Sequence, residues 1–344
     1  MVATSTESPT VQFLSADGRF SPTPAAEQYA SYLDGVDEQL HRSFYREMAV
    51  VRRFDIEAAN LQRQGQLGLW VPSHGQEAAQ VGSAFAMRPQ DHVFPSYREH
   101  VVGKIRGVDL LGVLALLRGT THGGWNPSDP ANGNFHLYTL VLGSQALHAT
   151  GYAMGLTLDG ATGTGDPEKD AAVVVYFGDG ASSQGDVSEA MVFAASYRTP
   201  EVFFLQNNHY AISVPVATQS RSPLYLRSSG FGIPGVQIDG NDVLASFAVT
   251  AKHLATLARA VGPSSSRRSP TGSGRTPRAT TPRSTAPTTS SPPGSPETRS
   301  PASPPTCAAR VRRSPSSTRS TRRLPTSRPT SAAVSSRSSH RPPR

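Results

Sequence analysis

Hydrophobic residues recur every three or four positions in several segments of the chain, as they do along one face of an amphipathic helix. The clearest segment runs from Glu38 to Gln64, and Gly65 and Gly68 favour the end of that helix. Two of the other segments are rich in small residues, which favour close packing. The pattern predicts helices over residues 38–64, 75–87, 101–119, 143–158 and 242–261, with Asp242 near the start of the last one.

Continuous apolar runs indicate buried strands. Residues 171–177 read AAVVVYF and residues 201–206 read EVFFLQ, with a predicted helix over residues 185–197 between them. Such runs are typical of parallel strands that are covered on both faces, and strand, helix and strand together form a right-handed βαβ unit. Residues 92–100 predict a strand end and its loop, and residues 235–240 a further strand. We expect an α/β fold with a doubly wound, mostly parallel sheet.

Composition divides the chain into three parts. Residues 1–38 are polar and predict an N-terminal arm, and residues 39–263 predict the folded domain. Residues 264–344 contain 16 Arg, a single acidic residue, no Lys and no aromatic residue, which predicts a disordered low-complexity tail. This tail carries a charge of +15, so the total of +8 leaves −7 for residues 1–263. The high pI therefore does not indicate a nucleic-acid-binding domain, and nucleic acid is not an expected partner.

Cysteine usage and hydropathy exclude several other classes of protein. The single cysteine, Cys307, lies in the tail, so residues 1–263 contain neither a disulfide nor a thiolate metal site. The first ten residues lack the basic start and apolar core of a signal peptide. The longest apolar run, residues 110–117, is too short to cross a membrane. We expect a cytoplasmic protein without membrane contact.

Polar residues follow both predicted strands of the βαβ unit. Asp179, in the sequence GDG, comes just after residues 171–177, and Asn208, in the sequence NN, comes just after residues 201–206. Neighbouring parallel strands end at one edge of the sheet, where ligands bind. A carboxylate and an amide oxygen suit Mg²⁺ shared with phosphates, and backbone N–H groups beside Gly180 can bind diphosphate. Alternatively, Asp179 caps a helix and the two asparagines form a turn.

The GDG…NN motif resembles that of thiamine-diphosphate enzymes, and other segments narrow the resemblance. Over residues 40–263 the chain resembles the α subunit of the E1 component of 2-oxo acid dehydrogenase complexes. Transketolase-like and acetolactate-synthase-like enzymes share the GDG…N motif but not SYREH or GQEAAQVG. The resemblance implies a sheet of the thiamine-diphosphate-binding type, with thiamine diphosphate and Mg²⁺ as cofactors. The matching segments read FYREMAVVRRFD, LQRQG, GQEAAQVGSAFAM, FPSYREH, HATGYAMG and FGDGASSQGDVSEA.

The resemblance implies a role for each residue that matches a family motif. Asp179, Asn208 and the backbone carbonyl of Tyr210 would bind Mg²⁺. The backbone N–H groups of Gly180 and Ala181 would contact the diphosphate. On the opposite side, the diphosphate would meet Tyr97 and Arg98, and the aminopyrimidine would meet the backbone around Leu140 and Leu142.

Three further residues are candidates for catalysis. By the resemblance, His136 would lie near the substrate, although a lone loop histidine is often simply solvated. Asp186 and Glu189 are three positions apart and share one helix face. The family's matching acids join acids of the β subunit in a proton-relaying cluster, and crowded carboxylates raise at least one pKa. The alternative is a solvated acidic first turn, which the helix dipole favours.

The resemblance implies oxidative decarboxylation of a small 2-oxo acid, with transfer of the acyl group to a lipoyl group on E2. Pyruvate is the first expected substrate and a branched-chain 2-oxo acid, such as 3-methyl-2-oxobutanoate, is the alternative. The glutamate that activates the aminopyrimidine comes from the β subunit in this family. An α₂β₂ assembly and a lipoyl-bearing E2 are therefore the expected partners.

The sequence departs from the family after residue 263. The family continues with a strand and a mobile loop whose histidine contacts the cofactor and substrate, whereas this chain reads SSSRRSPTGSGRTPRATTPRST. One interpretation is a true low-complexity tail, which would make the chain an inactive truncated relative or a polyanion-binding protein. We favour a frameshift. If the reading frame is moved back by one base, so that it starts at the third base of codon 263, synonymous codon choices permit the sequence VLIEAVTYGIGAHTPRDDP. A single missing base would then have removed the loop histidine.

Overall fold

The structure is a computed structural model that describes residues 10–260, and the side chains of residues 10–257. The predicted tail, residues 264–344, and the proposed frameshift site lie outside the described residues. In chain order the elements are η1 (Pro24–Leu33), α1 (Glu38–Arg63), α2 (Glu77–Ala86), β1 (His92–Phe94), α3 (His100–Ile105), α4 (Leu110–Arg118), η2 (Pro130–Asn132), α5 (Ser144–Leu158), β2 (Val173–Gly178), η3 (Ala181–Ser183), α6 (Gly185–Tyr197), β3 (Glu201–Gln206), β4 (Tyr210–Ala211), β5 (Val214–Pro215), α7 (Val216–Gln219), η4 (Leu224–Phe231) and α8 (Val243–Ala260).

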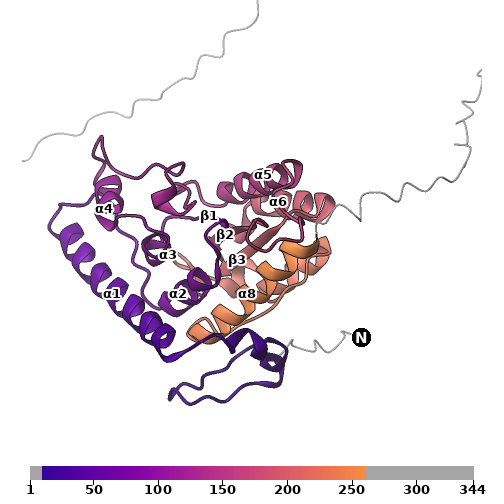
Figure 1. The fold of residues 1–344 in the computed structure, drawn as a ribbon. Helices are drawn as coiled ribbons and strands as arrows, with labels where there is room; N and C mark the ends of the chain where they lie inside the picture. The colour runs from indigo at the N-terminus through magenta and orange to yellow at the C-terminus, as the bar shows by residue number, and fades with distance from the viewer. Residues whose placement is uncertain (1–9, 261–344) are drawn as a thin grey trace, which may run out of the picture. The chain divides into compact units, whose positions relative to one another are not determined.

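The described residues contain a parallel sheet in the order β1-β2-β3 (Figure 1). The register pairs Val173 with Glu201 and Gly178 with Gln206, so β2 and β3 end side by side. The two apolar runs are therefore neighbouring parallel strands joined by a helix, as predicted. A small antiparallel sheet of β4 and β5 follows β3.

Helices cover both faces of the sheet, which explains why its strands are apolar throughout. On one face lie α5 and α6 (Figure 1). They pack against the side chains of Phe94, Val173 and Val175. On the other face lie α2 and α8, and the Ser83 hydroxyl of α2 shares a 2.7 Å hydrogen bond with the Tyr176 hydroxyl of β2. The predicted α/β fold with a doubly wound parallel sheet is confirmed.

Helices α2 and α8 approach each other closely at Gly82. A Cβ atom at this position would lie 2.4 Å from the carbonyl oxygen of Val243 and 2.7 Å from the Cβ of Ser246. The Ser246 hydroxyl also donates to the carbonyl oxygen of Ala79 at 2.6 Å. The small side chains within positions 75–87 therefore permit α2 and α8 to pack closely, as the sequence predicts for this helix.

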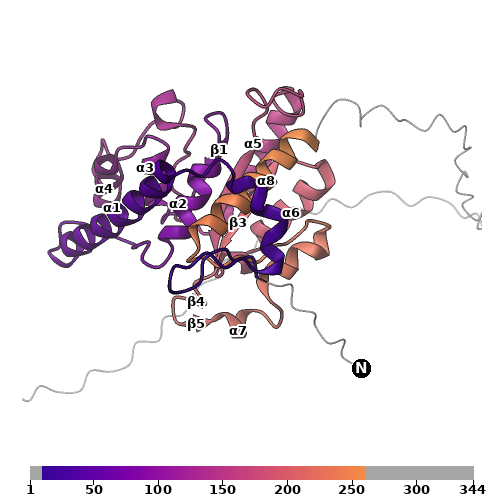
Figure 2. The ribbon, with the colours of Figure 1, turned by 60° about the horizontal axis from the view of Figure 1, so that its bottom comes forward.

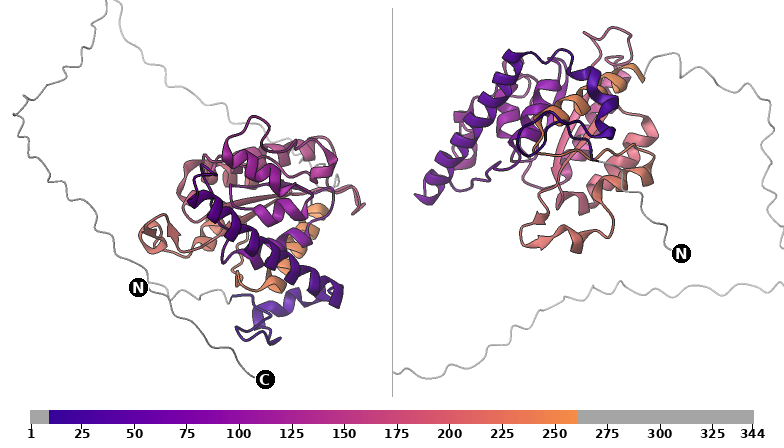
Figure 3. Two further views of the ribbon diagram at one scale, coloured as in Figure 1. Left: turned by 90° about the vertical axis from the view of Figure 1, so that its left-hand side faces the viewer. Right: turned by 90° about the horizontal axis from the view of Figure 1, so that it is seen from below.

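The described part of the N-terminal arm, from residue 10 onward, packs on this helical layer, and η1 lies beside α8 (Figure 3). Val11 and Phe13 are fully buried. The carboxylate of Asp242 accepts hydrogen bonds from the N–H groups of Phe13 and Leu14 and also from Leu244 and Ala245 at the start of α8. One buried carboxylate therefore caps α8 and attaches the arm to it.

Two sequence predictions of secondary structure are wrong. Residues 235–240 do not form a strand of the sheet, because their ladder contact is a single bridge between Val11 and Ile238. The helix predicted over residues 101–119 is two helices, α3 and α4. Gly107 separates them with a φ of 103°, which glycine adopts without strain but which a helix cannot continue through.

Candidate functional site

The two candidate metal ligands follow neighbouring strands at the same edge of the sheet. Asp179 comes directly after β2, and Asn208 comes two residues after the end of β3. The pairing of Gly178 with Gln206 aligns these two strand ends. The edge is the carboxyl end of a parallel sheet, the usual place for a ligand in α/β folds.

Asp179 is buried and its carboxylate faces α7. Its side chain is 2% exposed, and Oδ2 accepts a hydrogen bond from Nε2 of Gln219 at 3.1 Å. The backbone carbonyl of Asp179 accepts a 2.6 Å bond from the hydroxyl of Ser182. Helix α6 begins six positions later, after Gln184, which makes no side-chain cap. Asp179 is therefore not the cap of α6, in contrast to the alternative interpretation.

The two asparagines do form turns, as the alternative predicts for them. Oδ1 of Asn207 accepts from the N–H of His209 at 2.9 Å, and Oδ1 of Asn208 accepts from the N–H of Tyr210 at 3.1 Å. His209 and Ile212 have φ values of 70° and 59°, uncommon for residues other than glycine. These turns send the chain from β3 into the hairpin of β4 and β5, which projects at the lower edge of Figure 2.

The GDG loop lies against this hairpin. A Cβ atom on Gly180 would lie 2.8 Å from the Cβ of Ala211, so the close approach requires glycine. Ala181 begins the short helix η3 and is buried. N–H groups at the start of a helical turn lack partners within that turn, so those of Gly180 and Ala181 can bind an anion such as a diphosphate.

Tyr97 and Arg98 lie on the loop that follows β1. The Arg98 guanidinium donates to the carbonyl oxygen of Pro72 at 2.9 Å and lies 5.7 Å from the centre of the Tyr97 ring. Both side chains are half-buried. The guanidinium is thus held by one bond and one ring contact, and its planar fork suits phosphate oxygens.

A buried polar network that sequence reasoning missed supports this loop. Oε2 of Glu99 accepts from the N–H and hydroxyl of Ser96, and Oε1 accepts from Nε2 of Gln206 at 2.6 Å. Gln80 donates from Nε2 to the Gln206 side chain at 3.1 Å and to the Arg98 carbonyl at 3.3 Å. Glu99 is fully buried, and this burial raises the pKa of its carboxyl. The network ties the Tyr97–Arg98 loop to the end of β3.

In the sequence, the position of Glu99 next to Arg98 in SYREH was the only signal that pointed to this network. Nothing local distinguishes a buried glutamate from an exposed one, because burial depends on α2 and β3, whose residues Gln80 and Gln206 are far away in the sequence.

The segment around Leu140 and Leu142 lies beside the same loop. The N–H of Thr139 donates to the carbonyl of Ser96 at 2.8 Å. Gly143, with a φ of 100°, lies so close to α6 that a Cβ there would be 3.0 Å from the Cβ of Gln184. Leu140 is exposed, whereas Leu142 packs into the core beside α5 and α6. The structure thus brings this segment and Tyr97 to the same edge of the sheet.

His136 lies in an aromatic cluster beside β1. Its ring stacks on Phe94 with centroids 3.9 Å apart and approaches the rings of His92 and Tyr152. Burial lowers the pKa of His136 to about 4, so the imidazole is neutral at physiological pH. Its Nε2 is buried and has no hydrogen-bond partner among the described residues. A role near a substrate remains a prediction for this side chain.

Asp186 and Glu189 lie on the first two turns of α6. Asp186 is half-buried and Glu189 is exposed. Neither carboxylate has a hydrogen bond or ion pair within the described residues. Both the predicted contact with a partner subunit and the solvated first turn are consistent with this placement.

The donor set at the sheet edge fits a hard cation held together with a diphosphate. It offers one carboxylate, one amide oxygen and backbone carbonyls, which are the oxygen ligands that Mg²⁺ takes while keeping sites for phosphate and water. In residues 10–257 no group of three His, Cys, Asp or Glu side chains could hold a metal ion by itself. The predicted set does not need such a group, because only one of its ligands is a carboxylate.

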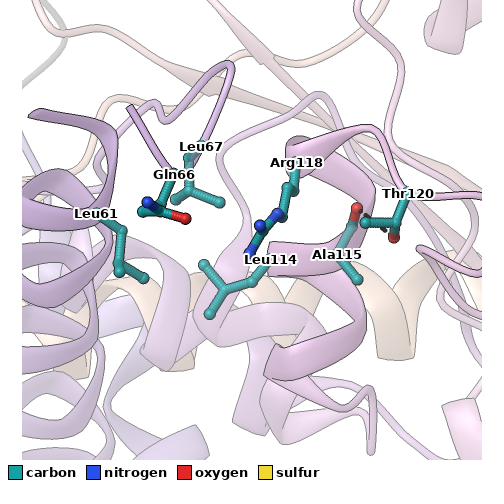
Figure 4. Close-up of a pocket in the computed structure, with 7 residues that line it drawn as sticks. All are labelled: Leu61, Gln66, Leu67, Leu114, Ala115, Arg118 and Thr120. Carbon is teal, nitrogen blue, oxygen red and sulfur yellow. Dashed lines mark hydrogen bonds between the residues drawn. The ribbon is translucent and has the colours of Figure 1, made fainter. Parts of the chain in front are cut away.

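Two surface cavities lie beside the C-terminal half of α4 and share Arg118. One of about 450 Å³ is drawn in Figure 4, where Arg118 and Gln66 extend between the α1 and α4 sides. The second, of about 310 Å³, shares Arg118 and reaches Tyr138 and Leu140. Neither cavity contains a predicted diphosphate or metal ligand. The first cavity is lined by Leu61, Gln66, Leu67, Leu114, Ala115, Arg118 and Thr120.

No helix within residues 10–260 is long and apolar enough to cross a membrane.

The fold and this edge define an α/β protein with polar candidate ligands at the carboxyl end of a parallel sheet. The family model of the dehydrogenase E1 component matches residues 45–263, which is more than half of the chain. The chain belongs to the dehydrogenase E1 component family. This membership agrees with the resemblance to E1 α subunits and makes thiamine diphosphate the expected cofactor.

Relatives of two kinds match the chain. It is 42% identical over 255 residues to the 3-methyl-2-oxobutanoate dehydrogenase subunit alpha of Mycobacterium tuberculosis (strain CDC 1551 / Oshkosh), covering 74% of this chain and 65% of the relative. It is 36% identical over 235 residues to the pyruvate dehydrogenase E1 component subunit alpha of Bacillus subtilis (strain 168), covering 68% and 60%. The chain thus spans less than two thirds of the length of either relative. A transketolase from Leishmania mexicana aligns with a TM-score of 0.48 at 16% identity, covering 62% of this chain and 35% of that one.

Proposed function

We propose that the chain is the α subunit of the E1 component of a 2-oxo acid dehydrogenase complex and binds thiamine diphosphate with Mg²⁺. The observation that carries the proposal is the shared sheet edge, where Asp179 follows β2 and Asn208 follows β3. Membership of the E1 family and the close approach of Gly180 in the GDG loop to Ala211 support it.

The residues of this chain would bind and orient the cofactor. The side chains of Asp179 and Asn208 and the carbonyl of Tyr210 would hold Mg²⁺. The N–H groups of Gly180 and Ala181 would bind the diphosphate from one side. When bound, thiamine diphosphate supplies the nucleophilic carbon and the electron sink that decarboxylation of a 2-oxo acid requires.

The opposite wall of the site would come from the loops after β1 and before α5. Arg98 and Tyr97 would bind the diphosphate from this side, held by the Glu99 network. Backbone groups around Leu140 and Leu142 would contact the aminopyrimidine. The strongly lowered pKa of His136 suits a neutral imidazole that donates or accepts a hydrogen bond near the substrate, without carrying charge.

The substrate would be a small 2-oxo acid. Pyruvate and 3-methyl-2-oxobutanoate are both candidates, because relatives named for each match the chain. Asp186 and Glu189 would join acids of a β subunit in proton transfer, and that subunit would supply the glutamate that activates the cofactor. The proposal therefore includes an α₂β₂ assembly that passes its acyl group to a lipoyl-bearing E2.

The proposal includes a frameshift after codon 263. The family match ends at residue 263, where the composition of the chain also changes, and this coincidence supports it. Sequencing the gene across codons 250–290 tests it, and we expect an additional base just after codon 263. An mRNA sequence that confirms the displayed frame would contradict the frameshift. The displayed polypeptide would then be expected to retain cofactor weakly and to show little turnover with a β subunit.

Cofactor binding by the full chain tests the proposed function. Calorimetric titration with thiamine diphosphate should give binding that requires Mg²⁺ and that is lost in Asp179→Ala. The matched control is Asp159→Ala, which removes an exposed carboxylate just after the end of α5, at the opposite end of that helix from the segment around Leu140 and Leu142. Binding that is independent of Mg²⁺, or that survives Asp179→Ala, would contradict the proposed site.

A further inference from the structure

Gln219, the last residue of α7, contacts a proposed metal ligand directly. Its Nε2 donates to Oδ2 of Asp179 at 3.1 Å. Within the described residues it is the one side chain that donates to this carboxylate. Asp179 is almost completely buried, so its orientation depends on this bond rather than on solvent. With Oδ2 engaged by the amide, Oδ1 remains the oxygen for a cation.

Arg227 on η4 connects both sides of this contact. Its Nη2 donates to the carbonyl oxygen of Gln219 at 3.3 Å. Its Nη1 donates to the carbonyl and hydroxyl oxygens of Ser182, each at 3.1 Å. The Ser182 hydroxyl in turn donates to the carbonyl of Asp179. The four residues close a ring of hydrogen bonds that begins and ends at Asp179.

This ring fixes the far end of the segment that carries the other metal ligands. Asn208 and Tyr210 lie where the chain leaves β3, and Gln219 is the last residue of α7. Figure 2 shows β4, β5 and α7 together at its lower edge. The segment of residues 208–219 is therefore attached to the GDG loop at both ends. Near its start the contact is Gly180 against Ala211, and at its end it is Gln219 bonded to Asp179.

We propose that Gln219 is a positioning residue for the Mg²⁺ ligand Asp179, and that Arg227 holds Gln219 in place. This inference rests on the proposed function, because it assigns a role at the same cofactor site. The bond from an amide N–H to a carboxylate is charge-assisted and so directional. It selects one orientation of the carboxylate before the cation binds. Residues that orient metal ligands in this way change metal affinity by about 10- to 100-fold when they are removed.

The test measures the Mg²⁺ concentration at which the full chain binds thiamine diphosphate. Gln219→Leu removes the donor and keeps a similar volume, and it should raise the half-saturating Mg²⁺ concentration by about 10- to 100-fold. Gln39→Leu makes the same change at an exposed position of α1 and should leave that concentration unchanged. Arg227→Leu should shift it in the same direction as Gln219→Leu.

A second readout separates positioning of the metal ligand from general damage to the site. At saturating Mg²⁺, the Gln219→Leu variant should bind thiamine diphosphate as tightly as the parent, because excess metal compensates for a poorly oriented ligand. An unchanged Mg²⁺ requirement would overturn the inference and leave the proposed function intact. Weak cofactor binding that excess Mg²⁺ does not restore would also overturn it. A parent chain without Mg²⁺-dependent binding would overturn both proposals.

Discussion

Replacing Glu201 by methionine should remove a large part of the pH dependence of stability. Glu201 begins β3 and is 7% exposed. Its Oε2 accepts a 2.8 Å bond from the Thr150 hydroxyl, while its Oε1 is buried and has no hydrogen-bond partner among the described residues. Burial raises the pKa of this carboxyl from 4.5 to about 8. The folded protein therefore keeps Glu201 protonated at neutral pH.

The sign and size of the effect follow from proton linkage. Between its unfolded and folded pKa values, Glu201 is protonated in the folded state and ionised in the unfolded state. Its contribution to stability is fully present below the unfolded pKa and is lost as the pH rises through the folded pKa. Each pH unit in this window lowers the free energy of unfolding by about 1.4 kcal/mol. Between about pH 5 and 7.5 the loss is about 3 kcal/mol.

Urea unfolding followed by circular dichroism at the two pH values measures this loss. The free energy of unfolding of Glu201→Met, relative to the parent, should rise by about 3 kcal/mol from the lower to the higher pH. Burial lowers the pKa values of His92, His100 and His136 to about 4, so these groups destabilise both proteins as the pH falls below 6.5 and cancel in the difference. Glu27→Met is the control at an exposed site. A pH-independent difference between Glu201→Met and the parent would refute the reasoning.

Two further predictions concern packing and the buried network. Gly82→Ala should lower the free energy of unfolding by about 2 kcal/mol, because the new Cβ would meet the Val243 carbonyl and force α2 from α8. Gly151→Ala on α5, where a Cβ meets no atom within 4 Å, should instead stabilise by about 0.5–1 kcal/mol in the same urea assay, and equal effects would contradict the packing argument. Glu99→Leu should cost about 3 kcal/mol, since the Ser96 N–H and Gln206 amide lose their acceptor. Thermal or urea unfolding at neutral pH measures it, and parent-like stability would show that the network contributes little.

The candidate site was predictable from sequence to the extent that it depends on strand ends. A continuous apolar run has to be buried, and a polar residue just after it has to lie at the edge of the sheet. That reasoning locates Asp179 and Asn208, and the family resemblance adds Tyr97 and Arg98. The supporting residues were not predictable. Gln219 contacts Asp179 across 40 positions of sequence, and Gln206 contacts Glu99 across 107.

The sequence by itself determined the elements that depend on local pattern. Periodicity predicts α1 and α8, because a helix buries the one face on which its apolar residues recur. Continuous apolar runs predict β2 and β3, because a strand that is covered on both faces buries successive residues. Tertiary structure decided the features that depend on which surfaces meet. It left residues 235–240 outside the sheet, since their partner is the N-terminal arm at Val11. It also brought a glutamine from α7 onto Asp179, because side-chain hydrogen bonds between distant segments exist only once the helices and strands have packed.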